Sequence, residues 1–176
     1  MALRRILYER GVCFIMEHME YLGLMFALFG AALAWGMAGI GSAIGVGVAG
    51  ESAAGVLSED PDKFVKCLML QALPGTQGFY GFITFFWVLN KLQVFGTPIK
   101  PDWVQGLMIF AACLPVALVC WYSAISQGKA AAASIQMIAR RPEELGRAFI
   151  LPAMVETYAV LSLLTSILLL NVIHVG

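Results

Sequence analysis

Charged residues are scarce in this sequence. Of its 176 residues, 12% are charged and 60% are hydrophobic, whereas a soluble domain usually contains about 25% charged residues. This chain has too little polar surface to cover a water-soluble globule, and its apolar content excludes disorder. The 11 Lys and Arg residues are balanced by 11 Asp and Glu residues, which argues against a nucleic-acid-binding protein. The composition predicts a membrane protein.

Cysteine and histidine are too few and too scattered to form a metal or redox centre. The sequence contains four cysteines and two histidines: Cys13, Cys67, Cys113, Cys120, His18 and His174. The cysteines form no CxxC pair, so we interpret them as small apolar residues. Both histidines lie near the ends of the chain, and neither is part of a recognisable catalytic pattern. The chain has no recognisable catalytic site of its own.

Four long apolar runs define the expected architecture. Three of them, residues 22–50, 67–90 and 103–128, contain no Asp, Glu, Lys or Arg, and the fourth, 148–176, contains only Glu156. A helix of about 20 apolar residues spans a bilayer. Helices are required because backbone polar groups in hydrocarbon must bond to one another. We therefore predict an all-α, multi-pass protein of the cell membrane, with four transmembrane helices and both termini on one side.

The connections divide the chain into two helical hairpins. We expect an N-terminal tail at 1–18, a first hairpin at 19–95, a linker at 96–102 and a second hairpin at 103–176. The linker contains Pro98 and Pro101, which prevent a continuous helix. Tight turns are predicted at 58–62 and 139–143.

Basic residues predict which side of the membrane the turns face. Five lie near the two tight turns, and two lie in or next to the linker: Lys63, Lys66, Arg140, Arg141 and Arg147, against Lys91 and Lys100. The positive-inside rule places the tight turns in the cytoplasm. Three arginines of the tail, Arg4, Arg5 and Arg10, oppose this orientation. The tail is a poor signal peptide, and a true start at Met16 or Met19 would remove the conflict.

The two hairpins are related by an ungapped internal repeat. The tripeptide 42–44 matches 123–125, Pro61 matches Pro142, and Leu89-Asn90 matches Leu170-Asn171, all in one register. Apolar bias alone does not align a tripeptide, both turn prolines and a terminal Leu-Asn in this way. The sequence indicates a duplicated hairpin whose halves run in the same sense, which is a parallel repeat.

Differences between the halves indicate a candidate site. Glu156 replaces Gly75 of the first half, and Gln127 replaces Val46. At about 1.5 Å per helical residue, Glu156, Gln127, Thr76 and Gln77 all lie roughly 21–24 Å from the turns. A carboxylate at this depth must be protonated, paired or bound to a cation.

Structural explanations for these polar residues remain open at this point. Glu156 is alternatively a structural acid tied to Lys129 or to a nearby hydroxyl. Thr76, Gln77 and Gln127 alternatively form hydrogen bonds that only hold helices together. Lys129 and Glu51 are expected to extend towards the cytoplasmic surface.

The first helix is rich in glycine, and we interpret four of its glycines as helix-packing residues: Gly39, Gly41, Gly45 and Gly47. Gly41-x-x-x-Gly45 is a motif for close approach of two helices. The third helix carries a counterpart run of small residues at Ala124, Ser126, Gly128 and 130–134. We expect the first and third helices to pack closely and to form an inner ring in an assembly, with the second and fourth helices outside. A cofactor loop is disfavoured because the run lies inside an apolar span.

These residues resemble the duplicated rotor subunit of V-type (V/A-type) ATPases and ATP synthases, the proteolipid or subunit K family. The resemblance runs from about Met19 to the C-terminus. It includes the glycine-rich helix and three further segments: Leu73-Pro74-Gly75-Thr76-Gln77-Gly78, Gln127-Gly128-Lys129 and Val155-Glu156-Thr157-Tyr158-Ala159.

The resemblance implies a homo-oligomeric ring that turns in the lipid bilayer against a stator subunit, with its cytoplasmic turns seated on central-stalk subunits. It implies no cofactor and a transported ion. The ion ligands would be Glu156, Gln127, Thr76, Gln77 and the backbone carbonyl of Leu73. Because all five positions are present, the resemblance favours Na⁺ over H⁺. The chain would then have no enzymatic site itself but would belong to a rotary ATPase.

Two other functions compete with this interpretation. An uncoupled pore or scaffold built of glycine-rich hairpins would leave Glu156 and its polar neighbours at the same depth without a role. A small-solute transporter made of parallel repeats would have a cavity lined from both halves, whereas only one half carries the acid.

Overall fold

The computed structural model describes the backbone of residues 2–175 and the side chains of residues 21–175. The elements in chain order are α1 (Ala2–Glu59), η1 (Pro61–Lys63), α2 (Phe64–Ala72), η2 (Leu73–Gly75), α3 (Thr76–Lys91), α4 (Trp103–Arg140), η3 (Pro142–Glu144) and α5 (Leu145–Val172). No strand occurs within the described backbone. The predicted all-α fold is confirmed. Residues 2–18 of the predicted tail belong to α1, and their side chains lie outside the described part.

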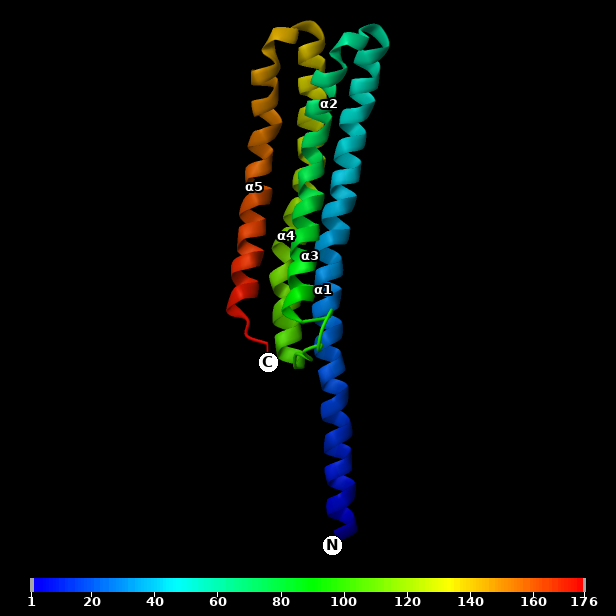
Figure 1. Cartoon of the computed structure of the whole chain (residues 1–176), viewed down its shortest axis with the longest axis vertical. Coiled ribbons are helices and arrows are strands. Elements are labelled where there is room, and N and C mark those ends of the chain that lie inside the picture. Colours follow the sequence, from blue (N-terminus) through cyan, green and yellow to red (C-terminus); the bar gives the residue numbers. More distant parts are fainter. Residues whose placement is uncertain (1, 176) are drawn as a thin grey trace.

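The helices form one elongated bundle of two hairpins. Both tight turns lie at one end of the bundle, and both chain ends lie towards the other (Figure 1). Each turn begins with a proline at the first position of a short 3₁₀ helix, Pro61 in η1 and Pro142 in η3. Proline is tolerated there because the first N–H of a helix has no intrahelical partner.

Within residues 21–175, three helical segments are long and apolar enough to span a membrane without interruption: Tyr21–Glu59, Trp103–Arg140 and Pro142–Val172. The remaining predicted span, the second at 67–90, is divided into α2, η2 and α3. Pro74 has no N–H to donate, and the N–H of Thr76 bonds to the carbonyl of Leu73 in a 3₁₀ pattern. Together α2, η2 and α3 run continuously along the bundle (Figure 1). The chain is a multi-pass membrane protein.

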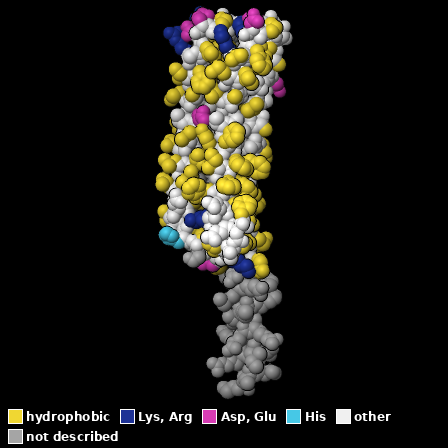
Figure 2. All heavy atoms as spheres, in the orientation of Figure 1, with side chains coloured by type: hydrophobic (Ala, Val, Ile, Leu, Met, Phe, Trp, Pro, Cys, Tyr) yellow, Lys and Arg dark blue, Asp and Glu magenta, His cyan; other side chains and the backbone are white. Residues whose placement is uncertain are grey.

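The surface of the bundle supports this assignment. Figure 2 shows apolar side chains over most of the visible face, with charged side chains gathered mainly at its two ends. Large apolar residues such as Phe79, Tyr122 and Leu161 are more than half exposed, at 69%, 74% and 57%. Exposed aromatic and aliphatic area on this scale is unfavourable in water and favourable against lipid or another subunit.

Small residues allow α1 and α4 to pack backbone to backbone. A Cβ added at Gly41 would lie 2.4 Å from the carbonyl oxygen of Trp121, and one at Gly45 would lie 2.3 Å from that of Ala124. No side chain fits at either position, so these two glycines set the distance between the helices. A Cβ at Gly39 or Gly47 would meet no atom of another helix within 4 Å.

The bundle contains two apolar clusters separated along its length by polar residues. The cluster nearer the chain termini includes Ala38, Val88 and Cys120, and the cluster nearer the turns includes Leu70 and Ile135. Between these positions along the helices lie the buried polar side chains of Ser42, Gln77, Ser123 and Gln127. The sequence therefore places a polar layer between the two apolar clusters, and its buried members require hydrogen-bond partners.

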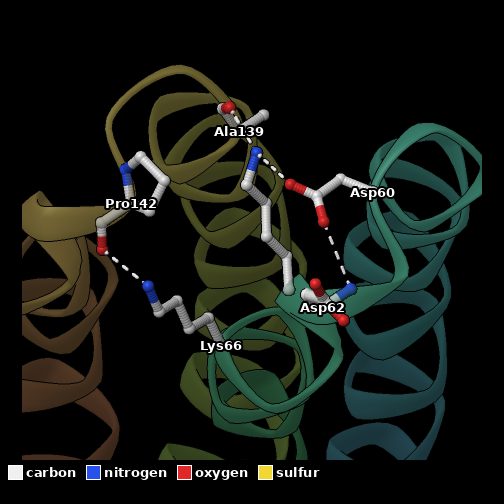
Figure 3. A network of polar contacts seen from close by, with 6 residues as sticks. Asp60, Asp62, Lys66, Ala139 and Pro142 are labelled. Atoms are coloured by element: carbon white, nitrogen blue, oxygen red, sulfur yellow. Dashed lines mark hydrogen bonds and ion pairs between the residues drawn. The ribbon is translucent and has the colours of Figure 1, made fainter.

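Lysines of the first hairpin hold the two turns together. Lys63 Nζ donates to the carbonyl of Ala139 at 2.7 Å, and Lys66 Nζ donates to the carbonyl of Pro142 at 3.1 Å (Figure 3). Lys63 also forms an ion pair with Asp60 at 3.0 Å. These bonds tie the first turn to a carbonyl at the end of α4 and to one in η3.

Candidate functional site

The carboxylate of Glu156 lies between the two hairpins. It is carried by α5 and is partly buried. Its Oε1 accepts a hydrogen bond of 2.6 Å from the hydroxyl of Tyr80 on α3, and its Oε2 accepts a longer one of 3.4 Å from Gln127 Nε2 on α4. Three helices thus converge on one acidic group, and both of its oxygens have a donor.

A continuous series of polar contacts extends from Gln127 to the break in the second span. Gln77 Nε2 donates to Gln127 Oε1, and both glutamine side chains are fully buried. The hydroxyl of Thr76 lies 3.3 Å from Gln77 Oε1 and donates to the carbonyl of Leu73 at 3.0 Å. The series joins carbonyl, hydroxyl, amide and carboxylate oxygens in one connected layer.

The 3₁₀ turn η2 positions the first-hairpin part of this layer. Because Pro74 interrupts the α-helical hydrogen bonding, the Leu73 carbonyl accepts from both the N–H and the hydroxyl of Thr76. Gly78 N donates to Ser42 Oγ at 2.7 Å, which ties α3 to α1 just after the turn. The turn is therefore held in place from the neighbouring helix as well as by its own bonds.

A separate hydrogen bond positions the residues that the second hairpin contributes to the polar layer. Ser123 Oγ donates to the carbonyl of Val155 at 3.1 Å. Ser123 lies one helical turn before Gln127 on α4, and Val155 immediately precedes Glu156 on α5. This bond fixes α5 against α4 at the level of the carboxylate.

The structure brings together all five positions that the resemblance implies as ion ligands: Leu73, Thr76, Gln77, Gln127 and Glu156. It adds Tyr80, which sequence reasoning missed. Tyr80 lies four residues after Thr76 and thus on the same helical face, and that spacing was the available signal. The exposed side chains of Lys129 and Glu51 lie apart from this layer.

The chemistry of the site is limited by its donor set. Among residues 21–175, no group of three or more His, Cys, Asp and Glu side chains could hold a metal ion. One carboxylate surrounded by neutral oxygens suits a single monovalent hard cation or a proton. The arrangement has no nucleophile next to a base. Its oxygens provide acceptors of the kind that a small cation or a proton requires.

Comparisons with known proteins agree with the duplication. The family of ATP synthase C subunits matches the chain twice, at residues 29–88 and 110–169. The internal repeat has the same register, because it also pairs position 29 with 110 and position 88 with 169. Each copy of the family unit therefore corresponds to one helical hairpin.

Two known proteins are similar over most of this chain. The V-type sodium ATPase subunit K of Enterococcus hirae is 46% identical over 156 residues, which cover 86% of this chain and 97% of that protein. The A-type ATP synthase subunit K of Methanocaldococcus jannaschii is 44% identical over 147 residues, which cover 84% of this chain and 62% of that protein. The chain belongs to the family of ATP synthase C subunits, as a duplicated member of the V/A type.

Proposed function

We propose that this chain is the ion-carrying subunit of a rotor ring in the membrane sector of a rotary V-type ATPase or ATP synthase. Glu156 would bind the ion reversibly, and rotation of the ring would carry it between two access paths. The observation that supports this proposal is the position of Glu156, whose oxygens meet Tyr80 and Gln127 inside an apolar bundle. A pore or scaffold has no need for such an acid.

We propose Na⁺ as the transported ion, with H⁺ as the alternative. Na⁺ is a hard cation and prefers oxygen ligands. The side chains of Thr76, Gln77, Gln127 and Glu156 and the carbonyl of Leu73 offer such oxygens in one connected layer. A bound proton requires only the carboxylate of Glu156 and one hydrogen-bond acceptor. With H⁺ as the transported ion, the amides of Gln77 and Gln127 would therefore have no role in transport.

Cation binding would require the two glutamines to rotate together. In the structure Gln127 presents its amino group to Glu156 and its oxygen to Gln77. Rotating both amides by half a turn would direct the Gln127 oxygen towards the carboxylate and the Gln77 oxygen towards the Gln127 amino group. The bond between the glutamines is thereby kept in both arrangements.

Charge balance explains how a loaded site would pass lipid. One carboxylate neutralises one Na⁺, so the loaded site has no net charge, whereas the unloaded carboxylate is costly in hydrocarbon. A fixed cation on a stator subunit would pair with Glu156 and release the ion. Moving one charge across a membrane potential of 100 mV changes its free energy by about 2.3 kcal/mol. Several subunits must therefore each carry an ion for every ATP hydrolysed or synthesised.

The turns at Pro61 and Pro142 would face the central stalk.

Protection from a carboxyl-modifying carbodiimide tests the proposal. We expect the reagent to modify the assembled wild-type ring at Glu156, and we expect Na⁺ to slow the reaction in a concentration-dependent way. Glu156→Gln is the control that should not react at this position. If Na⁺ has no effect but lower pH changes the rate, the transported ion is H⁺. If Glu156 does not react under any condition, the ion-carrier role is wrong.

A further inference from the structure

Two serines, one on α1 and one on α4, occupy equivalent positions in the internal repeat and lie at the level of the candidate site. Ser42 and Ser123 are counterparts in its register, and both are buried, at 8% and 6% exposure. Ser42 Oγ accepts from Gly78 N on α3 at 2.7 Å, and Ser123 Oγ donates to the carbonyl of Val155 on α5 at 3.1 Å. The hydroxyl is thus an acceptor in the first hairpin and a donor in the second.

The opposite directions of these two bonds follow from the proline in the second span. Val155 stands where the first half has Pro74. Pro74 lies in η2, and α3 begins at Thr76, so the N–H of Gly78 falls in the first turn of a helix, where N–H groups have no intrahelical partner. Through Val155, by contrast, α5 is one continuous helix, and there a carbonyl with a second lone pair can take an additional bond. A serine hydroxyl satisfies either group because it both donates and accepts.

Ser42 therefore caps the N-terminus of α3 from a different helix. A helix usually obtains this cap from a Ser, Thr, Asp or Asn just before its first turn. The residue before α3 is Gly75, which has no side chain that could accept a bond. The close approach of the two helices also depends on Gly78, because a Cβ there would lie 3.2 Å from Ser42 Oγ and 3.3 Å from Ser42 Cβ.

This cap controls where the carbonyl of Leu73 points. The N–H and the hydroxyl of Thr76 both bond to that carbonyl in the 3₁₀ pattern of η2. If the N–H of Gly78 lost the serine, the carbonyl of Pro74, four residues earlier, would be its partner in a regular α-helix. Forming that bond would start α3 earlier and turn the backbone of η2. The Leu73 carbonyl and the Thr76 hydroxyl would then leave the polar layer.

We propose that Ser42 is a positioning residue that sets the affinity for Na⁺ without touching the ion, and that Ser123 positions the carboxylate. Ser42 holds the neutral oxygens of Leu73 and Thr76, whereas Ser123 holds the backbone next to Glu156. Because a proton needs the carboxylate and not the neutral oxygens of η2, Ser42 acts on Na⁺ binding alone. This inference rests on the proposed function and assigns the two halves of the site to two counterpart serines.

Carbodiimide modification of Glu156 in the assembled ring separates the two roles. The rate without Na⁺ depends on the carboxyl group, and the Na⁺ concentration that halves this rate depends on all the ligands. Ser42→Ala should raise the half-protecting Na⁺ concentration roughly tenfold to a hundredfold, the usual effect of losing a group that orients a metal ligand. It should leave the rate without Na⁺ unchanged. Ser123→Ala should change both quantities, because Val155 adjoins Glu156.

Ser52→Ala is the matched control. Ser52 also lies on α1 and donates a 3.0 Å bond to the carbonyl of Ala132 on α4, but it is about 15 Å further along the helix than Ser42. Its loss removes an interhelical bond of the same kind and should leave both quantities at their wild-type values. Native electrophoresis shows whether each variant assembles. If Ser42→Ala forms no ring, Gly78→Ala replaces it, because its Cβ would push the serine hydroxyl away, and its results are judged by the same criteria.

Each contrary outcome has its own meaning. An unchanged half-protecting concentration in Ser42→Ala would overturn its positioning role and leave Glu156 as the ion carrier. A changed rate without Na⁺ in that variant would also overturn it, because Ser42 would then act on the carboxylate. The same loss of protection in Ser52→Ala would show that any weakened helix contact lowers Na⁺ affinity, which contradicts a specific role.

Two results concern the other parts of the proposal. An unchanged rate without Na⁺ in Ser123→Ala would overturn the role given to that serine. If Na⁺ does not protect even the wild type, the proposed choice of Na⁺ is wrong, and the role of Ser42 is overturned together with it.

Discussion

The hydroxyl of Tyr80 donates a 2.6 Å hydrogen bond to Oε1 of Glu156, and this bond joins the first hairpin to the acid of the second. The bond links residues on α3 and α5. A donor on a helix from the opposite hairpin holds the carboxylate inside the bundle rather than towards the lipid. Charge-assisted bonds of this kind are stronger than neutral ones, so this bond holds the acid in position more firmly than the longer bond from Gln127 does.

The first prediction tests that bond. Tyr80→Phe keeps the ring and removes the hydroxyl, and a hydrogen bond to a charged group contributes about 1.5–3 kcal/mol. We expect the Na⁺ concentration for half-maximal ATPase activity of the reconstituted complex to rise roughly tenfold to a hundredfold. Phe79→Leu, at a residue that is 69% exposed, is the matched control. Unchanged sodium dependence in Tyr80→Phe would show that the phenol does not hold the binding form of Glu156.

The second prediction concerns the acid itself. Glu156→Gln keeps the size of the side chain and one oxygen that can still accept the hydrogen bond from Tyr80, but it cannot carry a charge. We expect ATP-driven ion uptake by vesicles with the assembled mutant complex to fall to background, while the ring keeps its size on native electrophoresis. Uptake at the wild-type rate would be incompatible with Glu156 as the carrier.

The third prediction concerns the contact between α1 and α4. Gly45→Ala places a Cβ 2.3 Å from the carbonyl oxygen of Ala124 and 2.8 Å from the Cβ of Pro74. Overpacking of this kind costs about 1–3 kcal/mol, so the thermal midpoint of the isolated subunit should fall by several degrees. Gly36→Ala is the control, because a Cβ there meets nothing within 4 Å. Equal midpoints for the two variants would rule out the close contact.

The fourth prediction concerns pH at the first turn. The side-chain hydrogen bond from Lys63 lowers the pKa of Asp60 below its ordinary value of 3.8, with coulombic attraction and a backbone bond from Asp62 acting in the same direction. A depressed pKa means that the stabilisation is present above the unfolded pKa and is lost as pH falls through the folded pKa. We expect the hydrogen-exchange protection factors of the turn, which are corrected for the intrinsic exchange rate at each pH, to fall below about pH 4. Asp60→Asn should have lower protection factors than wild type at neutral pH, and these should change little in acid.

Much of the architecture could be predicted because it depends on local composition. The apolar runs, the turn prolines and the register of the repeat are visible without coordinates. The depth of Glu156, Gln127 and Thr76 follows from the helical rise alone, and the structure joins these residues in one polar layer.

The remaining features depend on helix rotation and on contacts between helices. Counting residues gives the depth of Tyr80 but not that its hydroxyl faces α5. A proline predicts an interrupted helix, yet the bonds that Thr76 makes to Leu73 appear only in the structure. Among the glycines, Gly41 and Gly47 look alike in sequence, whereas one contacts α4 and the other faces outward.

The last prediction separates sodium from proton transport. Thr76→Val removes a hydroxyl with little change of shape, and Gln127→Val introduces the residue that the first half carries as Val46. If the oxygens bind Na⁺, each change should raise the sodium concentration for half-maximal ATPase activity by about one to two orders of magnitude, at roughly 1.4 kcal/mol per tenfold. Lower pH should partly replace sodium, because protons and Na⁺ compete for the same carboxylate.

The measurement is ATPase activity against sodium concentration at two pH values, for the wild type and both variants. Thr157→Val is the matched control, since Thr157 is the repeat counterpart of Thr76 but is exposed, with its hydroxyl bonded to the carbonyl of Met154 at 2.8 Å. We expect this control to match the wild type. If the wild type itself needs no sodium at neutral pH, the transported ion is H⁺. Glu156 then keeps its role, and Thr76, Gln77 and Gln127 act only as hydrogen-bonding partners that hold the two hairpins together.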